Sequence, residues 1–427
     1  MTAEPSHQHQ VRKLLGNGPF RSFWLANLLS NLGTSAFVMA ITWLTVKHYG
    51  AAGIAALALG YGIPQFALQL LGGSASDRIN RRSLFLITES CFLVVALTLL
   101  AASLVMMPPL WLLVAVNACN GAISAFDTPA RTALISEMVS GEEVVSAQQF
   151  YSLSANLTNV FGPALGGILL SLGQDDHSHE EFAFFFNVLS FLPLLACIPF
   201  LPKARPKERS GATLGFIDSV TEGVTYVRDH LNLKSLLALL ALVMLLGMPF
   251  QTLLPIFVHS HLSMETGHGF YAALLSAVGL GAFMGSVLGM GLGELRQPGP
   301  ALAAAGVGLG LSVLILASSN VVHWASLAAF FAGGCGTLAI NLDNALVQGL
   351  TPVMMQGRLS SIANLTKGLQ AFSASAAGWF IHVLSHSPDT TTSGYLEVQI
   401  SLALLLMVGV VLLWPTLLRL QTGAVDT

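Results

Sequence analysis

The sequence predicts an all-α polytopic membrane protein with twelve transmembrane helices in two pseudo-symmetric six-helix bundles. Of its 427 residues, 54% are hydrophobic and only 9% are charged, whereas a soluble domain carries about 25% charged residues. The hydrophobic residues gather in runs that reach the roughly 20 residues needed to cross a bilayer. No soluble fold of this size buries so much apolar surface, so a soluble protein is excluded. The sequence contains no ATPase loop and no catalytic triad, so no enzyme is expected.

A break in the middle of the chain divides the runs into two sets of six. The segment 202–209 is rich in proline and charge, which is typical of a linker, and an amphipathic surface helix is expected around 214–229. The expected parts are an N-terminal tail (1–20), a first bundle (21–201), a cytoplasmic linker (202–233), a second bundle (234–418) and a C-terminal tail (419–427).

The expected spans follow one another along the chain, and the first is a retained helix because no convincing cleavage site follows it. They are 21–46, 52–74, 83–106, 109–131, 144–172, 181–201, 234–258, 269–292, 299–318, 322–347, 357–384 and 395–418. The halves repeat weakly at a spacing near 216 residues, which sets Gly73 opposite Gly289 and Asp127 opposite Asp343. Two such repeats place a substrate path between the bundles, near the membrane midplane.

Cationic residues predict the orientation, because loops rich in Lys and Arg stay on the cytoplasmic side. With both termini inside, all 18 Lys and Arg except Lys47 and Lys367 lie in cytoplasmic segments or at the adjoining helix ends. The net charge is near neutral and no basic tract is present, so no nucleic-acid partner is expected. The four cysteines fall inside apolar runs, so no disulfide framework is expected.

The stretch 72–82 is a short basic segment between two apolar runs. It predicts a cytoplasmic loop that acts either as a latch between helices or as plain topogenic charge, with Asp77 capping the following helix. The pattern resembles the loop 2–3 signature of the major facilitator superfamily, Gly-x-x-x-Asp-Arg-x-Gly-Arg-Arg. Asn80 stands at the second glycine, where Asn is the best substitute in a left-handed conformation. The matching residues are Gly73, Asp77, Arg78, Arg81 and Arg82.

Asp127 and Arg131 lie one helical turn apart near the cytoplasmic end of the fourth span. We expect Asp127 to pair with Arg81 or Arg131 in an inner gate in preference to binding substrate. Such a pair would hold an outward-open state and break when the two halves rock. In the second half, Asp343 with Arg358 is the corresponding candidate.

Polar side chains within spans are costly and normally face a cavity or a partner helix. The resemblance to the superfamily implies that helices 1, 2, 4, 5, 7, 8, 10 and 11 line the substrate path, and most polar residues in the spans fall on these helices. The resulting candidates for substrate binding are Asn27, Asn31, Gln65, Gln69, Asn117, Asn120, Gln148, Asn156, Gln251, Asn341, Lys367 and Gln370.

Three carboxyl groups within the spans, Glu89, Asp127 and Asp343, are the candidates for proton coupling. Glu89 has no obvious partner, so it either carries a proton or contacts the nearby arginine loop. For Asp127, pairing with an arginine argues against proton loading. Lys367, ten residues into a span, either pairs with Asp343 or faces a cavity that prefers anionic or polar substrates.

A further resemblance concerns bacterial exporters of the superfamily. The segment 162–167, Gly-Pro-Ala-Leu-Gly-Gly, is similar to an element of their fifth helix, and 126–139 resembles the subgroup that includes the enterobactin exporter and macrolide efflux proteins. The resemblance implies proton-driven export across the bacterial inner membrane by alternating access, for example of a siderophore. Multidrug or macrolide efflux is the alternative, followed by a lipid flippase or a non-transporting membrane sensor.

The expected partners are a small-molecule substrate, a proton gradient and the lipid bilayer, and the chain is expected to act as a monomer. No cofactor and no metal site is expected. Histidine pairs in the outer loops, such as His177-x-His179, have the spacing to bind a divalent metal or to titrate between pH 5 and 7. The simpler interpretation is that loops poor in Lys and Arg need other polar residues.

Overall fold

The computed structural model describes residues 16–140, 143–173, 180–201, 225–228, 230–261, 264–292, 297–351, 353–385 and 391–418. Within these ranges only the backbone is described for residues 70, 73–78, 145, 261, 264–266, 353–367 and 391. Several predictions concern parts outside these residues: most of both tails, the linker with its amphipathic helix except 225–228, and the pair His177-x-His179. The side chains of Gly73, Asp77, Arg78, Arg358 and Lys367 are also outside the described set.

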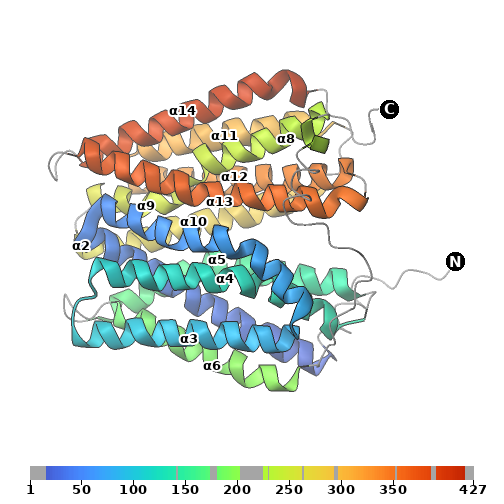
Figure 1. Cartoon of the computed structure of the whole chain (residues 1–427). Coiled ribbons are helices and arrows are strands. Elements are labelled where there is room, and N and C mark those ends of the chain that lie inside the picture. The colour runs from blue at the N-terminus through green and yellow to red at the C-terminus, as the bar shows by residue number, and fades with distance from the viewer. Residues whose placement is uncertain are drawn as a thin grey trace. The chain divides into compact units, whose positions relative to one another are not determined.

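Every regular element among the described residues is a helix, as predicted (Figure 1). The longest, α2 (Gly18–Arg78), bends at Gly50, whose φ of 59° is a conformation that favours glycine. The others are α3 (Arg81–Val105), α4 (Leu110–Met138), α5 (Val144–Ser171), α6 (Glu181–Cys197) with the 3₁₀ turn η2 (Ile198–Phe200), α8 (Leu231–Leu242), the π-helical turn η3 (Val243–Gly247), α9 (Pro249–His261), α10 (Met264–Leu292), α11 (Gly299–Ala317), α12 (Val322–Leu350), α13 (Val353–Leu384) and α14 (Thr391–Leu417).

Within the described residues, ten helical segments are long and apolar enough to cross a membrane. One of them, Gly18–Gln69, contains the first predicted span and most of the second, which the bend at Gly50 separates. The helix α13 covers the predicted span 357–384, although 353–367 have no described side chains. Counting α2 twice and adding α13 accounts for the twelve predicted spans.

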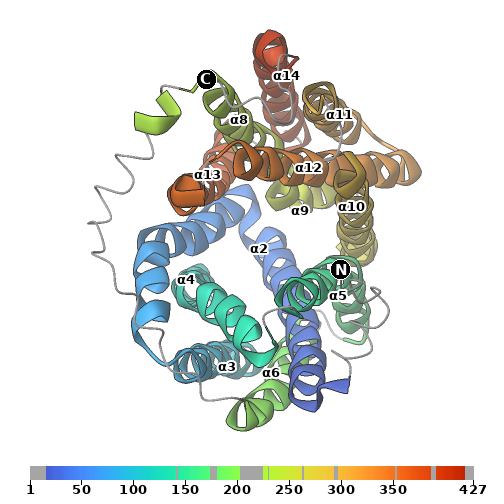
Figure 2. The same cartoon turned by 90° about the vertical axis from the view of Figure 1, so that its right-hand side faces the viewer.

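The chain divides into two compact units, Met1–Thr45 with Gly60–Arg209 and Val46–Leu59 with Ser210–Thr427. In the first unit α3 packs against α4 and α6, and in the second α12 packs against α10 and α11 (Figure 2). The middle of α2, Val46–Leu59, belongs to the second unit. There the hydroxyl group of Ser375 on α13 donates to the carbonyl oxygen of Ala55 at 2.9 Å. The bundle boundaries predicted from the sequence had placed 46–59 in the first bundle.

Glycines let the second and fourth spans of each half approach closely. A Cβ atom on Gly121 of α4 would lie 2.1 Å from the carbonyl oxygen of Tyr61 on α2, and one on Gly333 of α12 would lie 2.1 Å from that of Val278 on α10. Small residues at such crossings are typical of membrane helix pairs. The same crossing in both units agrees with the weak internal repeat.

The segment after the second span differs from the predicted loop. The helix α2 continues to Arg78, so Asp77 lies in its last turn and does not cap the next helix. Asn80 is the N-cap of α3: its side-chain oxygen accepts hydrogen bonds from the backbone N–H groups of Arg82 and Ser83, at 3.1 and 3.4 Å. Its φ of −57° is not left-handed. Both predictions were therefore wrong, because Asn serves here as a capping side chain.

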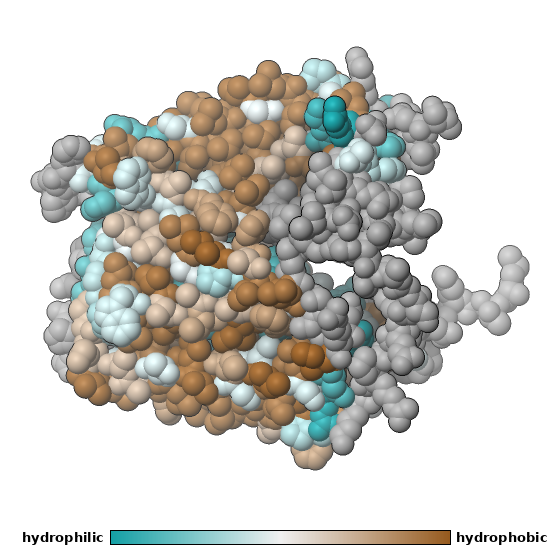
Figure 3. All heavy atoms as spheres, viewed as in Figure 1, coloured by the Kyte–Doolittle hydropathy of each residue, from teal (hydrophilic) through white to brown (hydrophobic). Residues whose placement is uncertain are grey.

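Hydrophobic side chains cover much of the visible outer surface (Figure 3). Large apolar residues are strongly exposed on several helices, among them Trp111, Phe200, Met290 and Leu412. In a soluble protein such patches would drive association. On helices of membrane-spanning length they are the surface that faces lipid.

Candidate functional site: a buried arginine and two carboxylates

The centre of the candidate site is Arg131 on α4. Its side chain bends back one turn to Asp127, whose Oδ2 atom lies 3.0 Å from Nε and 2.8 Å from Nη2 of the guanidinium. The i, i+4 spacing brings the two residues onto one helix face. The sequence predicted this pair as one of two alternatives for Asp127, and the structure contains it.

Helix α3 supplies the second acid. The carboxylate of Glu89 accepts a hydrogen bond from Nη2 of Arg131 at 2.5 Å. The preceding residue, Thr88, donates its hydroxyl hydrogen to Oδ1 of Asp127 at 2.9 Å. Glu89 therefore has a partner, and that partner is a helix residue and not the arginine loop proposed from the sequence.

Helix α2 completes the shell around the guanidinium. The side-chain oxygens of Asn27 and Asn31, one turn apart, accept hydrogen bonds from Nη1 of Arg131, with a length of 3.4 Å for Asn31. The ring of Phe85 on α3 lies 5.1 Å from the guanidinium carbon, a cation–π distance. Three helices of the first unit thus hold one arginine in place.

The charges of this cluster do not balance. Glu89 is fully buried, and Asp127 and Arg131 expose only 5% and 7% of their surfaces. Two carboxylates share one guanidinium, so the cluster carries a formal charge of −1 when both acids are ionised. In the described part of the chain, Oε2 of Glu89 has no hydrogen-bond partner. Burying an unpaired charge away from water is expensive in free energy.

The remaining arginines of the predicted gate have other contacts. Arg81 forms an ion pair with Glu137 near the end of α4, a residue that was not among the predicted gate residues. Arg82 donates to the carbonyl oxygens of Leu201 and Pro199, at 3.0 and 2.6 Å. The pairing of Asp127 proposed with Arg81 is thus not among the contacts of Asp127 that the structure shows.

Three of the predicted substrate-binding amides tie helices together. Gln148 on α5 donates to the carbonyl oxygen of Thr132 on α4 at 3.0 Å. In the second unit, Asn341 donates to the hydroxyl group of Ser286 at 3.2 Å, and Gln370 to a backbone oxygen at 3.4 Å. These bonds position helices and do not by themselves indicate a ligand.

Other predicted amides are half-buried. Asn117 makes further interactions within the protein. For five others, no hydrogen bond to a described residue is present; they are Gln65, Gln69, Asn120, Asn156 and Gln251.

Asp343 on α12 is the buried acid of the second unit. It exposes 1% of its surface, and no described residue donates a hydrogen bond to either carboxylate oxygen. Its pairing with Arg358 or Lys367 stays a prediction, because both side chains are outside the described set. At the repeat spacing, Val347 stands where the first half has Arg131, so α12 offers no cation at that position.

The chain resembles known membrane transporters along most of its length. A protein-family model described as a transmembrane secretion effector matches residues 14–423. The staphyloferrin A transporter of Staphylococcus aureus is 23% identical over 55% of this chain and 56% of its own length. The multidrug efflux pump Tap of Mycolicibacterium fortuitum is 26% identical over 56% of this chain and 59% of its own. The match therefore spans little more than half the length of these two relatives.

A longer match is to the enterobactin exporter EntS of Citrobacter koseri, 22% identical over 82% of this chain and 81% of the exporter. Among solved structures, a bacterial homologue of the human lysosomal transporter Spinster superposes with a TM-score of 0.69 over 97% of both chains at 13% identity. The nucleoside transporter NupG gives a TM-score of 0.72 over 95% of this chain and all of that chain at 10% identity. At these identities the two structures establish the fold alone.

Proposed function

Because this chain belongs to the transmembrane secretion effector family of the major facilitator superfamily, we propose that it is a proton-coupled exporter of a polar or anionic small metabolite such as a siderophore. The family makes it a multi-pass membrane transporter. The coupling ion, the direction and the cargo are the proposed part. Alternating access of the two bundles is the proposed mechanism.

The observation that carries the proposal is the charge imbalance around Arg131. A guanidinium stays charged throughout the physiological range, so any change of charge in the cluster must occur on a carboxyl group. Glu89 is the better candidate, because it accepts one hydrogen bond and its other oxygen has no partner among the described residues, whereas Asp127 has two contacts with Arg131 and one with Thr88. Protonation of Glu89 leaves a neutral, fully bonded pair of Asp127 and Arg131.

This cluster also suggests a revised role for the predicted gate. The cluster lies entirely within the first unit, which contains Asn27, Glu89, Asp127 and Arg131. A rigid movement of one bundle against the other would leave these contacts intact. We therefore assign the cluster to proton binding within the bundle and not to a lock that breaks during rocking.

Two features support a polar or anionic cargo. The half-buried amides without a described partner provide donors and acceptors on predicted lining helices, and Lys367 provides a cation within α13. The staphyloferrin A transporter and EntS carry siderophores by their names. The similarity to Tap makes multidrug efflux the second candidate.

The test compares wild-type and deletion cells under iron limitation by mass spectrometry of spent medium and cell extract. Export of a siderophore predicts a chelator that is depleted from the medium and accumulates in the deletion cells, and is restored by the wild-type gene. An unchanged profile together with increased drug sensitivity would instead favour multidrug efflux. Complementation with Glu89→Gln then tests whether the proton site is needed for the same export.

A further inference from the structure

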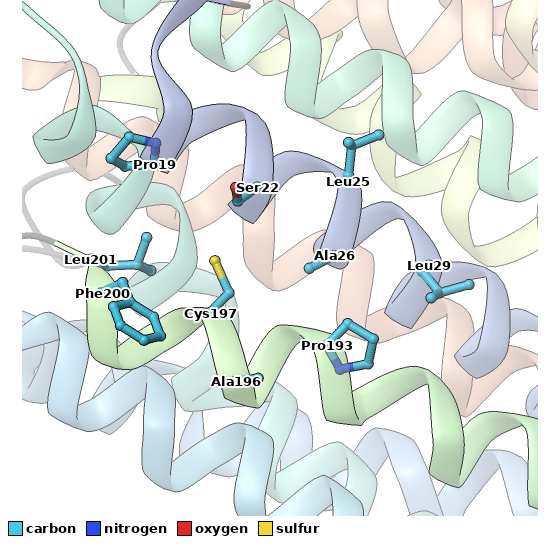
Figure 4. Close-up of a pocket in the computed structure, with 10 residues that line it drawn as sticks. All are labelled: Pro19, Ser22, Leu25, Ala26, Leu29, Pro193, Ala196, Cys197, Phe200 and Leu201. Carbon is cyan, nitrogen blue, oxygen red and sulfur yellow. The ribbon is translucent and has the colours of Figure 1, made fainter.

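Helices α2 and α6 of the first unit enclose an apolar groove on the surface of this bundle, with a volume of about 620 Å³ (Figure 4). The substrate candidates do not line it. Ser22 contributes a hydroxyl group, and the other lining side chains are apolar or, in Cys197, a thiol. The lining residues are Pro19, Ser22, Leu25, Ala26 and Leu29 from α2, and Pro193, Ala196, Cys197, Phe200 and Leu201 from α6 and the turn after it.

The length of the groove matches one leaflet of a bilayer. From Pro19 to Leu29 the helix α2 advances by about 15 Å, at 1.5 Å per residue. The hydrocarbon core of a bilayer is about 30 Å thick, so the groove spans roughly half of it. Leu25 and Phe200 expose 52% and 82% of their surfaces, so a lipid acyl chain in the groove would contact them from the lipid side.

Arg82 supplies a positive charge at one end of this groove. Its guanidinium donates to the carbonyl oxygens of Leu201, a lining residue, and Pro199. Both partners are neutral, and none of the ion pairs in the described part of the chain involves Arg82. The neighbouring Arg81 has the carboxylate of Glu137. Since a guanidinium has five N–H groups, Arg82 retains donors and charge for an anion.

We propose that the groove and Arg82 together form a binding site for an anionic phospholipid, with an acyl chain between α2 and α6 and the phosphate at Arg82. A hydrocarbon chain is already in an apolar phase before it enters the groove, so its burial gives little selectivity. The selectivity comes from charge, because basic sites between transmembrane helices attract anionic headgroups. By the predicted topology the lipid belongs to the inner leaflet. The site does not depend on the cargo or the coupling ion.

The test is native mass spectrometry of the full-length protein in detergent with added phosphatidylglycerol or phosphatidylcholine of identical acyl chains. We expect wild-type protein to retain phosphatidylglycerol preferentially. A single cation near the membrane surface changes the affinity for an anionic lipid about fivefold, so Arg82→Gln should lower this preference by about that factor. Arg82→Lys should retain most of it, because it keeps the charge.

Two further variants separate the lipid site from general effects of charge and folding. Ala196→Phe fills the groove but keeps Arg82, and should also reduce retention of phosphatidylglycerol. Lys234→Gln removes an exposed charge from the start of α8, in the other unit, and should change nothing. Photoactivatable phosphatidylglycerol should label peptides that contain 19–29 or 193–201. Equal retention of the two lipids by wild-type protein, undiminished preference in Arg82→Gln, or labelling confined to other helices would overturn the proposal.

Discussion

Replacement of Arg131 with methionine tests the energetic role of the buried cluster. The structure gives Arg131 two contacts with Asp127 and one with Glu89, all charge-assisted and away from water. Arg131→Met removes the guanidinium and leaves both acids buried. Removal of one partner from a buried ion pair costs about 3–5 kcal/mol of unfolding free energy, because the remaining charge loses its compensation.

A second variant shows whether this loss comes from the uncompensated acids. In the triple variant Glu89→Gln, Asp127→Asn, Arg131→Met, no charge is left in the cluster. Neutral replacement of a whole buried charge cluster is often tolerated, so the triple variant should recover at least about 2 kcal/mol of the loss in Arg131→Met. Arg131→Lys should lie between wild type and Arg131→Met, because an ammonium keeps the charge but lacks the planar fork.

The assay is equilibrium denaturation of each variant in the same detergent, followed by tryptophan fluorescence. Each free energy is compared with that of wild-type protein at one salt concentration. A change of less than about 1 kcal/mol in Arg131→Met would refute the argument, since it would lie within the range of exposed ion pairs. A triple variant no more stable than Arg131→Met would show that packing, and not charge, explains the loss.

Three other predictions concern the packing of a glycine, the cap of α3 and a buried aspartate. Gly121→Ala should lower the unfolding free energy by about 1–3 kcal/mol in the same denaturation assay, because the added methyl group would lie 2.1 Å from a backbone oxygen. The control Gly349→Ala, where a Cβ atom would have nothing within 4 Å, should not lower it. Asn80→Ala should cost about 1 kcal/mol through loss of the cap of α3, measured by the same method, and an unchanged value would argue against that cap. Asp127→Asn should lower the thermal midpoint, because Asp127 receives hydrogen bonds from Thr88 and Arg131; an unchanged midpoint would argue against a stabilising role for these bonds.

Much of the fold could be predicted from the sequence, because membrane spans are long apolar runs with charged ends. The sequence also suggested the pair Asp127–Arg131 as one of two alternatives, since residues four apart are neighbours on a helix. The helix ends were predicted less accurately than the spans themselves. The helix α4 continues to Met138, beyond the predicted end at 131, because the apolar run stops before the helix does. The second apolar run likewise stops before the helix α2, which continues to Arg78.

The composition of the candidate site could not be predicted in full. The contact of Glu89 with Arg131 joins α3 to α4 across 42 residues, and no local spacing reveals it. The same holds for Asn27, which reaches Arg131 across 104 residues. The ion pair of Arg81 with Glu137 was missed for the same reason. Each depends on how the helices pack, which periodicity alone does not specify.

The most direct test of proton coupling is flux in proteoliposomes with an imposed pH gradient. Purified wild-type protein and Glu89→Gln are reconstituted in parallel, and the transport of enterobactin and of staphyloferrin A is measured with and without the gradient. We predict that the gradient accelerates transport of a cargo by wild-type protein, and that Glu89→Gln still exchanges that cargo but no longer responds to the gradient. Equal acceleration in both proteins would contradict the assignment of the proton site to Glu89.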